Sequence, residues 1–334
     1  MKYLYLASLI SSLSILLVIT LSAGKRPTTI FIVGDSTAAN KSKPDTNPER
    51  GWGMALQGFF DSNVIVDNHA LNGRSSKSFI DEGHWAKVLD LIKPGDYVII
   101  QFGHNDEKPK ADRHTDPGTT FDATLLRYVE ETRAKGGIPV LMNAVVRRNF
   151  LRKSVEGVDD ESLRNTVYQD EAVNSDTLID THGAYLLSPR NVAEKHNVVF
   201  IDANAITHRL EQSLGIIGSR SLHMWFKPGE VESIPKGRHD NTHYNINGAH
   251  CVASLLAYAL VAKIPELRPY MHQYDYIVSR RGFGNYLDIQ SAVDAAPHGK
   301  SVRIHVLDGI WKRGSIDLKG KDIAFDLFDG AVIE

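Results

Sequence analysis

Four short polar clusters hold the side chains that a serine-based hydrolysis of an ester would need. A serine hydroxyl is a weak nucleophile and needs an adjacent base to take its proton. Negative charge then develops on the carbonyl oxygen, where fixed hydrogen-bond donors stabilise it. Each cluster alone is weak evidence, but together they predict one active site. In chain order they are Gly34-Asp35-Ser36, Asn72-Gly73-Arg74-Ser75, Gly103-His104-Asn105-Asp106 and Asp240-Asn241-Thr242-His243.

The last cluster supplies an acid–base pair. His243 is the candidate base for Ser36, and Asp240 lies three residues before it, where its carboxylate can turn back to the imidazole ring. A carboxylate in that place fixes the imidazole tautomer and stabilises the imidazolium that forms in the transition state. Alternatively, Asp240 caps the last helix of the chain or simply faces water.

Three groups are candidate donors to the developing oxyanion: the backbone N–H of Ser36, the backbone N–H of Gly73 and the side-chain amide of Asn105. Glycine at position 73 would let the backbone approach a substrate closely, because it has no Cβ. The alternatives are an ordinary turn glycine at 73 and a loop asparagine at 105 that bonds its own backbone.

The pattern of apolar runs predicts how these residues are positioned. Buried strands are expected at 28–33, 64–66, 97–102, 138–142 and 198–201, separated by helices at about 53–60, 84–92, 121–135, 188–196 and 247–262. This alternation predicts an α/β fold with a parallel sheet covered by helices on both faces. Ligands bind at the carboxyl ends of the strands in such sheets. The first three clusters follow the first three strands, and Asp240 and His243 are expected in a loop that enters the last helix.

The clusters resemble those of the SGNH hydrolases over roughly residues 28–262. The segments that begin at Gly34, Asn72 and Gly103 are similar to the rhamnogalacturonan acetylesterases in particular. The resemblance implies a three-layer αβα sandwich of flavodoxin-like form, with Ser36 as nucleophile, Gly73 and Asn105 as oxyanion donors, and Asp240 and His243 completing a triad. It further implies removal of acetyl groups from a pectic polysaccharide, without metal or cofactor. Two alternatives stay open: an esterase for lipid or another acylated sugar, and a non-catalytic pectin-binding protein.

The two ends of the chain differ from this central domain, expected at 24–265. Residues 1–23 have the positive start, apolar middle and small-residue end of a signal peptide, which predicts a secreted or periplasmic protein. No later segment is apolar enough to suggest a membrane span. Residues 274–334 resemble the opening of pectin methylesterases, which implies the start of a right-handed parallel β-helix, cut short. Strands are expected there at 302–306, 316–318 and 323–327.

Two internal segments are expected to be irregular. The polar, acidic segment 150–187 is predicted to be a surface insertion, and 218–239 is predicted to be loop because of its glycines and prolines.

Charge and composition limit the classes of partner and ligand that the protein is expected to bind. The net charge of −2 implies no nucleic-acid surface, and the single cysteine, Cys251, allows no internal disulfide. The histidines show no paired spacing that would require a metal. Arg74, beside Gly73, is the best-placed candidate to bind an anionic sugar. The group Arg147-Arg148, Arg152-Lys153 is either a second such candidate or a solvated face. The sequence leaves the oligomeric state open.

Overall fold

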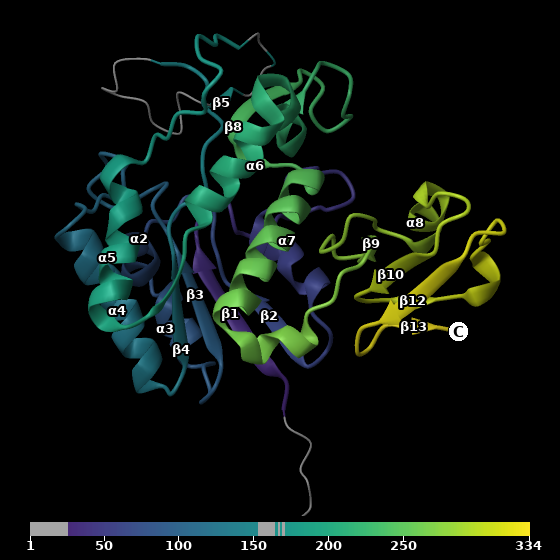
Figure 1. Ribbon diagram of the computed structural model, residues 1–334, viewed down its shortest axis with the longest axis horizontal. Helices are drawn as coiled ribbons and strands as arrows, with labels where there is room; N and C mark the ends of the chain where they lie inside the picture. The colour runs from purple at the N-terminus through teal and green to yellow at the C-terminus, as the bar shows by residue number, and fades with distance from the viewer. Residues whose placement is uncertain (1–25, 153–163, 166–167, 169–170) are drawn as a thin grey trace, which may run out of the picture.

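The central element is a five-stranded parallel sheet. The computed structural model describes residues 26–152, 164–165, 168 and 171–334, so the expected signal peptide and part of the expected insertion lie outside the described residues. The strand order is β2-β1-β3-β4-β6, with helices on both faces (Figure 1). All five predicted strands are confirmed, as β1 (Thr28–Gly34), β2 (Val64–Asn68), β3 (Tyr97–Gln101), β4 (Ile138–Met142) and β6 (Val199–Ile201).

Alternate residues of the strands face two separate hydrophobic cores, which explains why the strands are apolar along their length. Ile30 and Ile32 of β1 belong to one core, and Phe31 and Val33 belong to the other. The first core is covered by α1 (Trp52–Ala55), the 3-10 helix η1 (Leu56–Phe59), α6 (Ala203–Gly218) and α7 (Ile246–Lys263). The second is covered by α2 (Ser76–Asp81), α3 (His84–Leu89), α4 (Thr120–Ala134) and α5 (Leu187–His196).

Two of these helices, α2 and α6, were not predicted. The fully buried residues of α6 are Ala203, Asn204, Thr207 and Glu211, and its larger apolar side chains Ile206 and Leu210 are only partly buried, so polar residues interrupt the apolar stripe by which a helix is recognised in a sequence. Its helical backbone is also interrupted at Gly215, where φ is 66°. The helix expected at 53–60 divides into α1 and η1.

The segment 218–239 is more ordered than predicted. It contains the 3-10 helix η3 (Ser219–Leu222), strand β7 (His223–Phe226) and the start of strand β8 (Arg238–Tyr244). β8 lies between β7 and β5 (Arg164–Asn165) in an antiparallel sheet. Asp240 and His243 therefore lie on a strand, and the expectation that they lie in a loop is wrong. β8 reads Arg-His-Asp-Asn-Thr-His-Tyr and has none of the apolar alternation that would have revealed it.

The C-terminal part is built from short parallel strands. β10 (Val302–Val306) lies between β9 (Tyr276–Val278) and β12 (Ile323–Leu327), and β11 (Ile310–Trp311) pairs with β13 (Val332–Ile333). One helix, α8 (Ile289–Ala295), packs against them. The strand expected at 316–318 is absent, because the chain turns there: the Asp317 carboxylate accepts the N–H of Lys319 at 2.9 Å.

This C-terminal part packs beside α7 and η1 (Figure 1). Ile277 and Leu307 belong to the same buried cluster as the apolar side chains of α7. Arg50 donates to the carbonyl of Gly282 at 3.1 Å, and His305 Nδ1 lies 3.1 Å from the carbonyl of Gly58.

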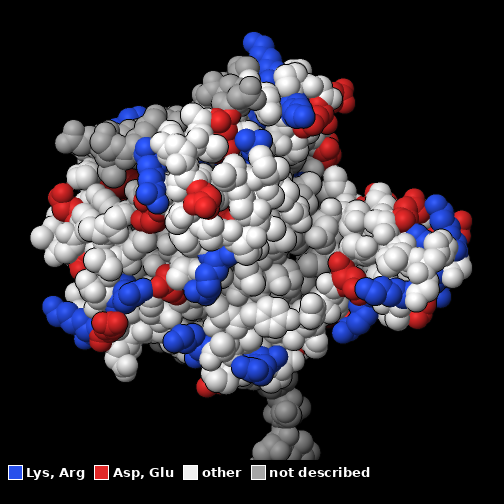
Figure 2. All heavy atoms as spheres, turned by 45° about the horizontal axis from the view of Figure 1, so that its top comes forward, with Lys and Arg blue, Asp and Glu red and all other residues white. Residues whose placement is uncertain are grey.

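Helix α7 is long and apolar enough to pass as a membrane-crossing segment, so the expectation that no later segment qualifies is wrong as stated. Half of it is buried inside the protein, where it covers the first core of the sheet. On the face of the protein shown in Figure 2, acidic and basic side chains are interspersed, and there is no large area of a single charge.

Candidate active site

Ser36, His243 and Asp240 form a continuous chain of hydrogen bonds. Ser36 lies two residues after the end of β1, and its Oγ is 2.9 Å from His243 Nε2. His243 Nδ1 is 3.0 Å from Asp240 Oδ2. Because a carboxylate only accepts hydrogen bonds, Nδ1 carries the imidazole proton and Nε2 is free to accept from Ser36. The fold thus brings together the three residues that the sequence suggested, although they span two hundred positions.

The surroundings of Asp240 keep it ionised. Its side chain is fully buried, and Oδ1 accepts the backbone N–H groups of Thr242 and His243 at 2.9 and 3.0 Å. Burial alone would raise the pKa of Asp240, but His243 and Arg238 outweigh it and hold that pKa well below its usual range. The alternative role of Asp240 as a helix cap is wrong, because Asn245 caps α7 by accepting from Gly248 N at 2.9 Å.

The loop that carries the nucleophile is fixed by polar contacts. The Asp35 carboxylate accepts the N–H and the hydroxyl of Thr37 at 2.9 and 2.7 Å, which shapes the turn around Ser36. The buried ammonium of Lys41 donates to the carbonyl of Ser36 and to the side chain of Asn72, both at 2.7 Å. Lys41 therefore ties the nucleophile loop to the loop that carries Gly73.

Gly73 and Asn105 lie on two loops that contact each other. Gly73 has a φ of +73°, and the N–H of Arg74 bonds the carbonyl of Leu71 across it, the backbone form that favours glycine in a type II turn. The side-chain amide of Asn105 donates to the carbonyl of Arg74 at 3.1 Å. Asn105 thus bonds a different loop, not its own backbone, and its amide retains a second N–H for another acceptor.

Residues 32–249 match the GDSL-like Lipase/Acylhydrolase family. The chain belongs to this family. It is 35% identical over 258 residues to the rhamnogalacturonan acetylesterase RhgT of Bacillus subtilis (strain 168), covering 77% of this chain and 97% of that relative. It is 27% identical over 255 residues to a rhamnogalacturonan acetylesterase of Emericella nidulans, covering 74% of this chain and 91% of that relative. These relationships make the chain a carboxylic ester hydrolase.

The fold agrees with a solved structure. The X-ray crystal structure of the Bacillus subtilis protein YXIM matches with a TM-score of 0.52 at 24% identity, covering 71% of this chain and 56% of that one. The two proteins therefore share the parallel sheet and its covering helices.

Asp106 supports the site of this GDSL-family esterase, a role that was not predicted from the sequence. Its buried carboxylate accepts the N–H of Ser76 at 3.1 Å and the hydroxyls of Ser76 and Thr115 at 2.5 and 3.0 Å. Burial raises its pKa to about 7, although the hydrogen bonds from Ser76 and Thr115 oppose that shift. Asp106 thereby holds the loop of Asn105 against the start of α2, directly after Gly73. Its position next to Asn105 was the available signal.

Glu49 and Arg238 also belong to the site, although neither was predicted from the sequence. Arg238 donates to Asp240 and, at 2.8 Å, to Glu49, and Lys41 lies 2.9 Å from the other Glu49 oxygen. Burial would raise the pKa of Glu49, but Lys41, His243 and Arg238 together lower it to about 2. Glu49 is thus an anion that balances two cations beside the triad. Arg238 and Asp240 are two residues apart, so both side chains lie on one face of β8. Their proximity could be inferred from the sequence only if this segment had been recognised as a strand.

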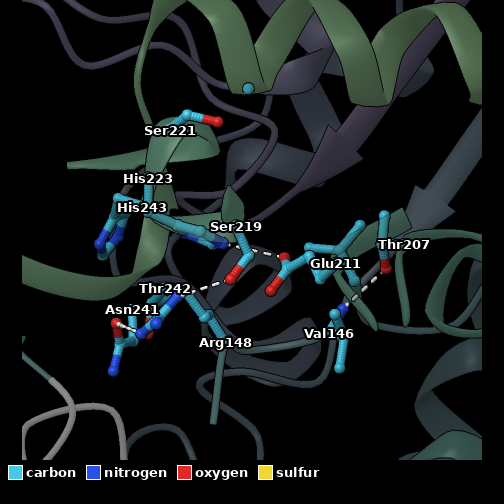
Figure 3. Close-up of polar contacts among 12 residues, drawn as sticks. Val146, Arg148, Thr207, Glu211, Ser219, Ser221, His223, Asn241, Thr242 and His243 are labelled. Carbon is cyan, nitrogen blue, oxygen red and sulfur yellow. Dashed lines mark hydrogen bonds and ion pairs between the residues drawn. The ribbon is translucent and has the colours of Figure 1, made fainter. Parts of the chain in front are cut away.

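Arg147 and Arg148 are neither a solvated face nor an open site for an acidic sugar, so both interpretations of the predicted basic group are wrong for this pair. Of its other two members, Arg152 is exposed and Lys153 lies outside the described residues. Both side chains are buried, and they form ion pairs with Glu107 and Glu171 respectively. Figure 3 shows Arg148 beside Asn241 and Ser219, beneath the strand that carries His243. Arg148 bonds the Asn241 side chain at 3.0 Å and the Asn241 carbonyl, through its backbone N–H, at 2.8 Å. Its role is to support β8.

Arg74, the predicted candidate for binding an anionic sugar, lies at the surface next to Gly73, but its guanidinium is occupied. It contacts Glu82 at 2.7 and 2.9 Å and the carbonyl of Asn72 at 2.9 Å.

Within the described part of the chain, no group of three His, Cys, Asp or Glu side chains is arranged to hold a metal.

Proposed function

We propose that this GDSL-family esterase removes acetyl groups from a pectic polysaccharide, rhamnogalacturonan, with Ser36 as the nucleophile. The observation that carries the proposal is the 2.9 Å contact between Ser36 Oγ and His243 Nε2, with Asp240 behind the ring. The choice of acetyl group and polysaccharide is supported by the relatives named rhamnogalacturonan acetylesterase, which align over most of this chain.

In the acylation step, Ser36 Oγ attacks the acetyl carbonyl carbon while His243 Nε2 takes the hydroxyl proton. The negative charge of the tetrahedral intermediate falls on the former carbonyl oxygen. The backbone N–H groups of Ser36 and Gly73 and the amide of Asn105 are its proposed donors. The imidazolium then gives its proton to the sugar oxygen, and the sugar leaves as an alcohol.

In the deacylation step, water replaces the sugar. His243 takes a proton from the water as its oxygen attacks the acetyl-Ser36 carbonyl, and the same donors stabilise the second intermediate. The proton then returns to Ser36 Oγ, which releases acetate and restores the enzyme. Throughout, the Asp240 carboxylate stabilises the imidazolium without itself becoming protonated.

The test is acetate release from a panel of esters: acetylated rhamnogalacturonan, acetylated xylan, 4-nitrophenyl acetate and 4-nitrophenyl esters of longer acids. We expect kcat/KM to be highest for acetylated rhamnogalacturonan and to fall as the acyl chain lengthens. A preference for long-chain esters, or for acetylated xylan, would contradict the proposed substrate while leaving the serine mechanism in place.

We also propose that residues 1–23 are a signal peptide and that the enzyme acts outside the cytoplasm. The support is the order of charged, apolar and small residues at the start of the chain. N-terminal sequencing of protein recovered from the medium or periplasm should begin near residue 24. Recovery with Met1 intact in the cytoplasm would contradict it.

For residues 274–334 we propose the first coils of a right-handed parallel β-helix of the kind that opens pectin methylesterases. The parallel pairings of β9 with β10 and of β10 with β12 support this interpretation. An experimental structure in which the path from β9 through β10 to β12 is left-handed would refute it.

A further inference from the structure

Arg113 is a cation beside the proposed oxyanion loop that the mechanism does not use. A methyl group placed on Gly73 would lie 3.6 Å from Arg113 Nη1, and, outside the adjoining residues, no other atom of the described chain would lie within 4 Å of it. Because Gly73 has no side chain, the guanidinium borders the space that a side chain at this position would fill.

Within the described ranges, the guanidinium of Arg113 is nearly free of protein partners. Its one ion contact among the described residues is from Nε to the exposed carboxylate of Asp112, at 3.6 Å, which is too long for a hydrogen bond. The side chain is 28% exposed, so it is reached by solvent yet held against the protein. Arg74 differs sharply, because its guanidinium is engaged by Glu82 and by the carbonyl of Asn72.

The loop that presents Arg113 is held in place. The N–H of Arg113 bonds the carbonyl of Lys110 at 2.9 Å, and Lys77 of α2 donates to the carbonyl of Ala111 at 2.6 Å. Two residues further on, the Thr115 hydroxyl bonds Asp106. Since Asp106 also holds the start of α2 directly after Gly73, the position of Arg113 relative to the oxyanion loop is fixed by the same network.

We propose that Arg113 binds the carboxylate of a uronic acid, on the acetylated sugar or on its neighbour, and so makes the enzyme select acidic over neutral acetylated polysaccharides. This inference rests on the proposed function for the location of the reacting ester. A planar guanidinium with its terminal nitrogens unoccupied matches a carboxylate through two parallel hydrogen bonds. Arg113 is therefore a specificity-determining residue, in the role that was predicted for Arg74.

Binding provides a test that does not depend on catalysis. In a Ser36→Ala background, the affinity for oligogalacturonate is measured by calorimetry at low salt, with and without Arg113→Gln. Loss of a charge-assisted bidentate contact should weaken Kd by about tenfold or more. Lys110→Gln, which removes an exposed cation from the same loop, is the matched control and should change Kd by less than about twofold. Equal Kd values with and without Arg113→Gln would overturn the proposal.

A second arm measures selectivity on the active enzyme. The ratio of kcat/KM for acetylated pectin with free carboxylates to that for the same pectin with methyl-esterified carboxylates should exceed one in the wild type. Arg113→Gln should bring that ratio close to one, and Lys110→Gln should keep it. A ratio unchanged by Arg113→Gln would contradict the assignment. Wild-type enzyme that binds oligogalacturonate through Arg113 but releases no acetate would instead refute the proposed function alone.

Discussion

Replacing Asp240 with asparagine tests the acid–base pair with little change of shape. Oδ1 of Asp240 accepts two backbone N–H groups, from Thr242 and His243. An asparagine that keeps both bonds must direct its NH₂ group at His243 Nδ1. The proton of the imidazole then moves to Nε2, which can no longer accept the proton of Ser36. The reverse amide orientation would leave two buried N–H groups without acceptors, at about 1–3 kcal/mol each.

The expected size of the effect follows from this geometry. Changing the carboxylate of a Ser-His-Asp triad to an amide lowers kcat by about 10⁴ through the wrong tautomer. At 1.36 kcal/mol for each tenfold, that is about 5 kcal/mol of lost transition-state stabilisation. In this chain Arg238 also donates to Asp240, so the introduced NH₂ would face a second donor. We therefore expect Asp240→Asn to lower kcat by about 10³ to 10⁴.

The assay is kcat on 4-nitrophenyl acetate, with thermal unfolding measured on the same samples. Asp202→Asn is the matched control, because Asp202 caps α6 by accepting from Ala205 N at 3.0 Å and contacts no triad residue in the described structure. Asparagine can keep this cap but loses the ion pair of Asp202 with Arg190, so the variant should lower the unfolding temperature slightly and leave kcat nearly unchanged. If Asp240→Asn lowered kcat by less than about tenfold in folded protein, the assignment of Asp240 would be wrong.

Three further predictions follow from the site and its supports. Asn105→Ala should lower kcat on 4-nitrophenyl acetate by about 10² to 10³, whereas a fall of less than threefold would remove Asn105 from the oxyanion site. Lys41→Met should lower the free energy of unfolding in urea by about 3 kcal/mol, because it leaves the largely buried carboxylate of Glu49 without one of its two cations; an unchanged value would contradict the proposed support. Acid should also destabilise the fold: burial would raise the pKa of Glu107, but Arg147 and His182 lower it from 4.5 to about 2. A carboxyl whose folded pKa is depressed stabilises the protein above the unfolded pKa, and that contribution is lost as pH falls from about 4.5 to 2. Glu107→Gln should flatten the pH dependence of unfolding in this window, and an equally steep curve would refute this.

The fold was predictable because both faces of the sheet are covered. Buried parallel strands such as β1 and β3 are continuous apolar runs, and each run is visible in the sequence without knowledge of its neighbours. Polar clusters directly after such strands must meet at one edge of the sheet. The sequence pattern alone therefore predicts that Ser36 lies near Asn105.

The features that were not predicted depend mainly on contacts between segments distant in the sequence. Strand β8 buries polar side chains: Asp240 bonds Arg238 and His243 of the same strand, and His243 also bonds Ser36. No apolar alternation therefore marked this segment as a strand. Arg148 looked like surface charge because its partner Glu171 lies 23 residues further on. The sequence likewise pointed to Arg74 and did not single out Arg113, because neither the pairing of Arg74 with Glu82 nor the approach of Arg113 to Gly73 can be seen in the sequence.

Covalent labelling of Ser36 tests the central claim most directly. A fluorophosphonate probe reacts with a serine only when a neighbouring base activates the hydroxyl. Mass mapping of the labelled enzyme should place one adduct on Ser36, with no adduct in Ser36→Ala and much slower labelling in His243→Ala. An adduct on another residue, or an equal labelling rate in His243→Ala, would contradict the account.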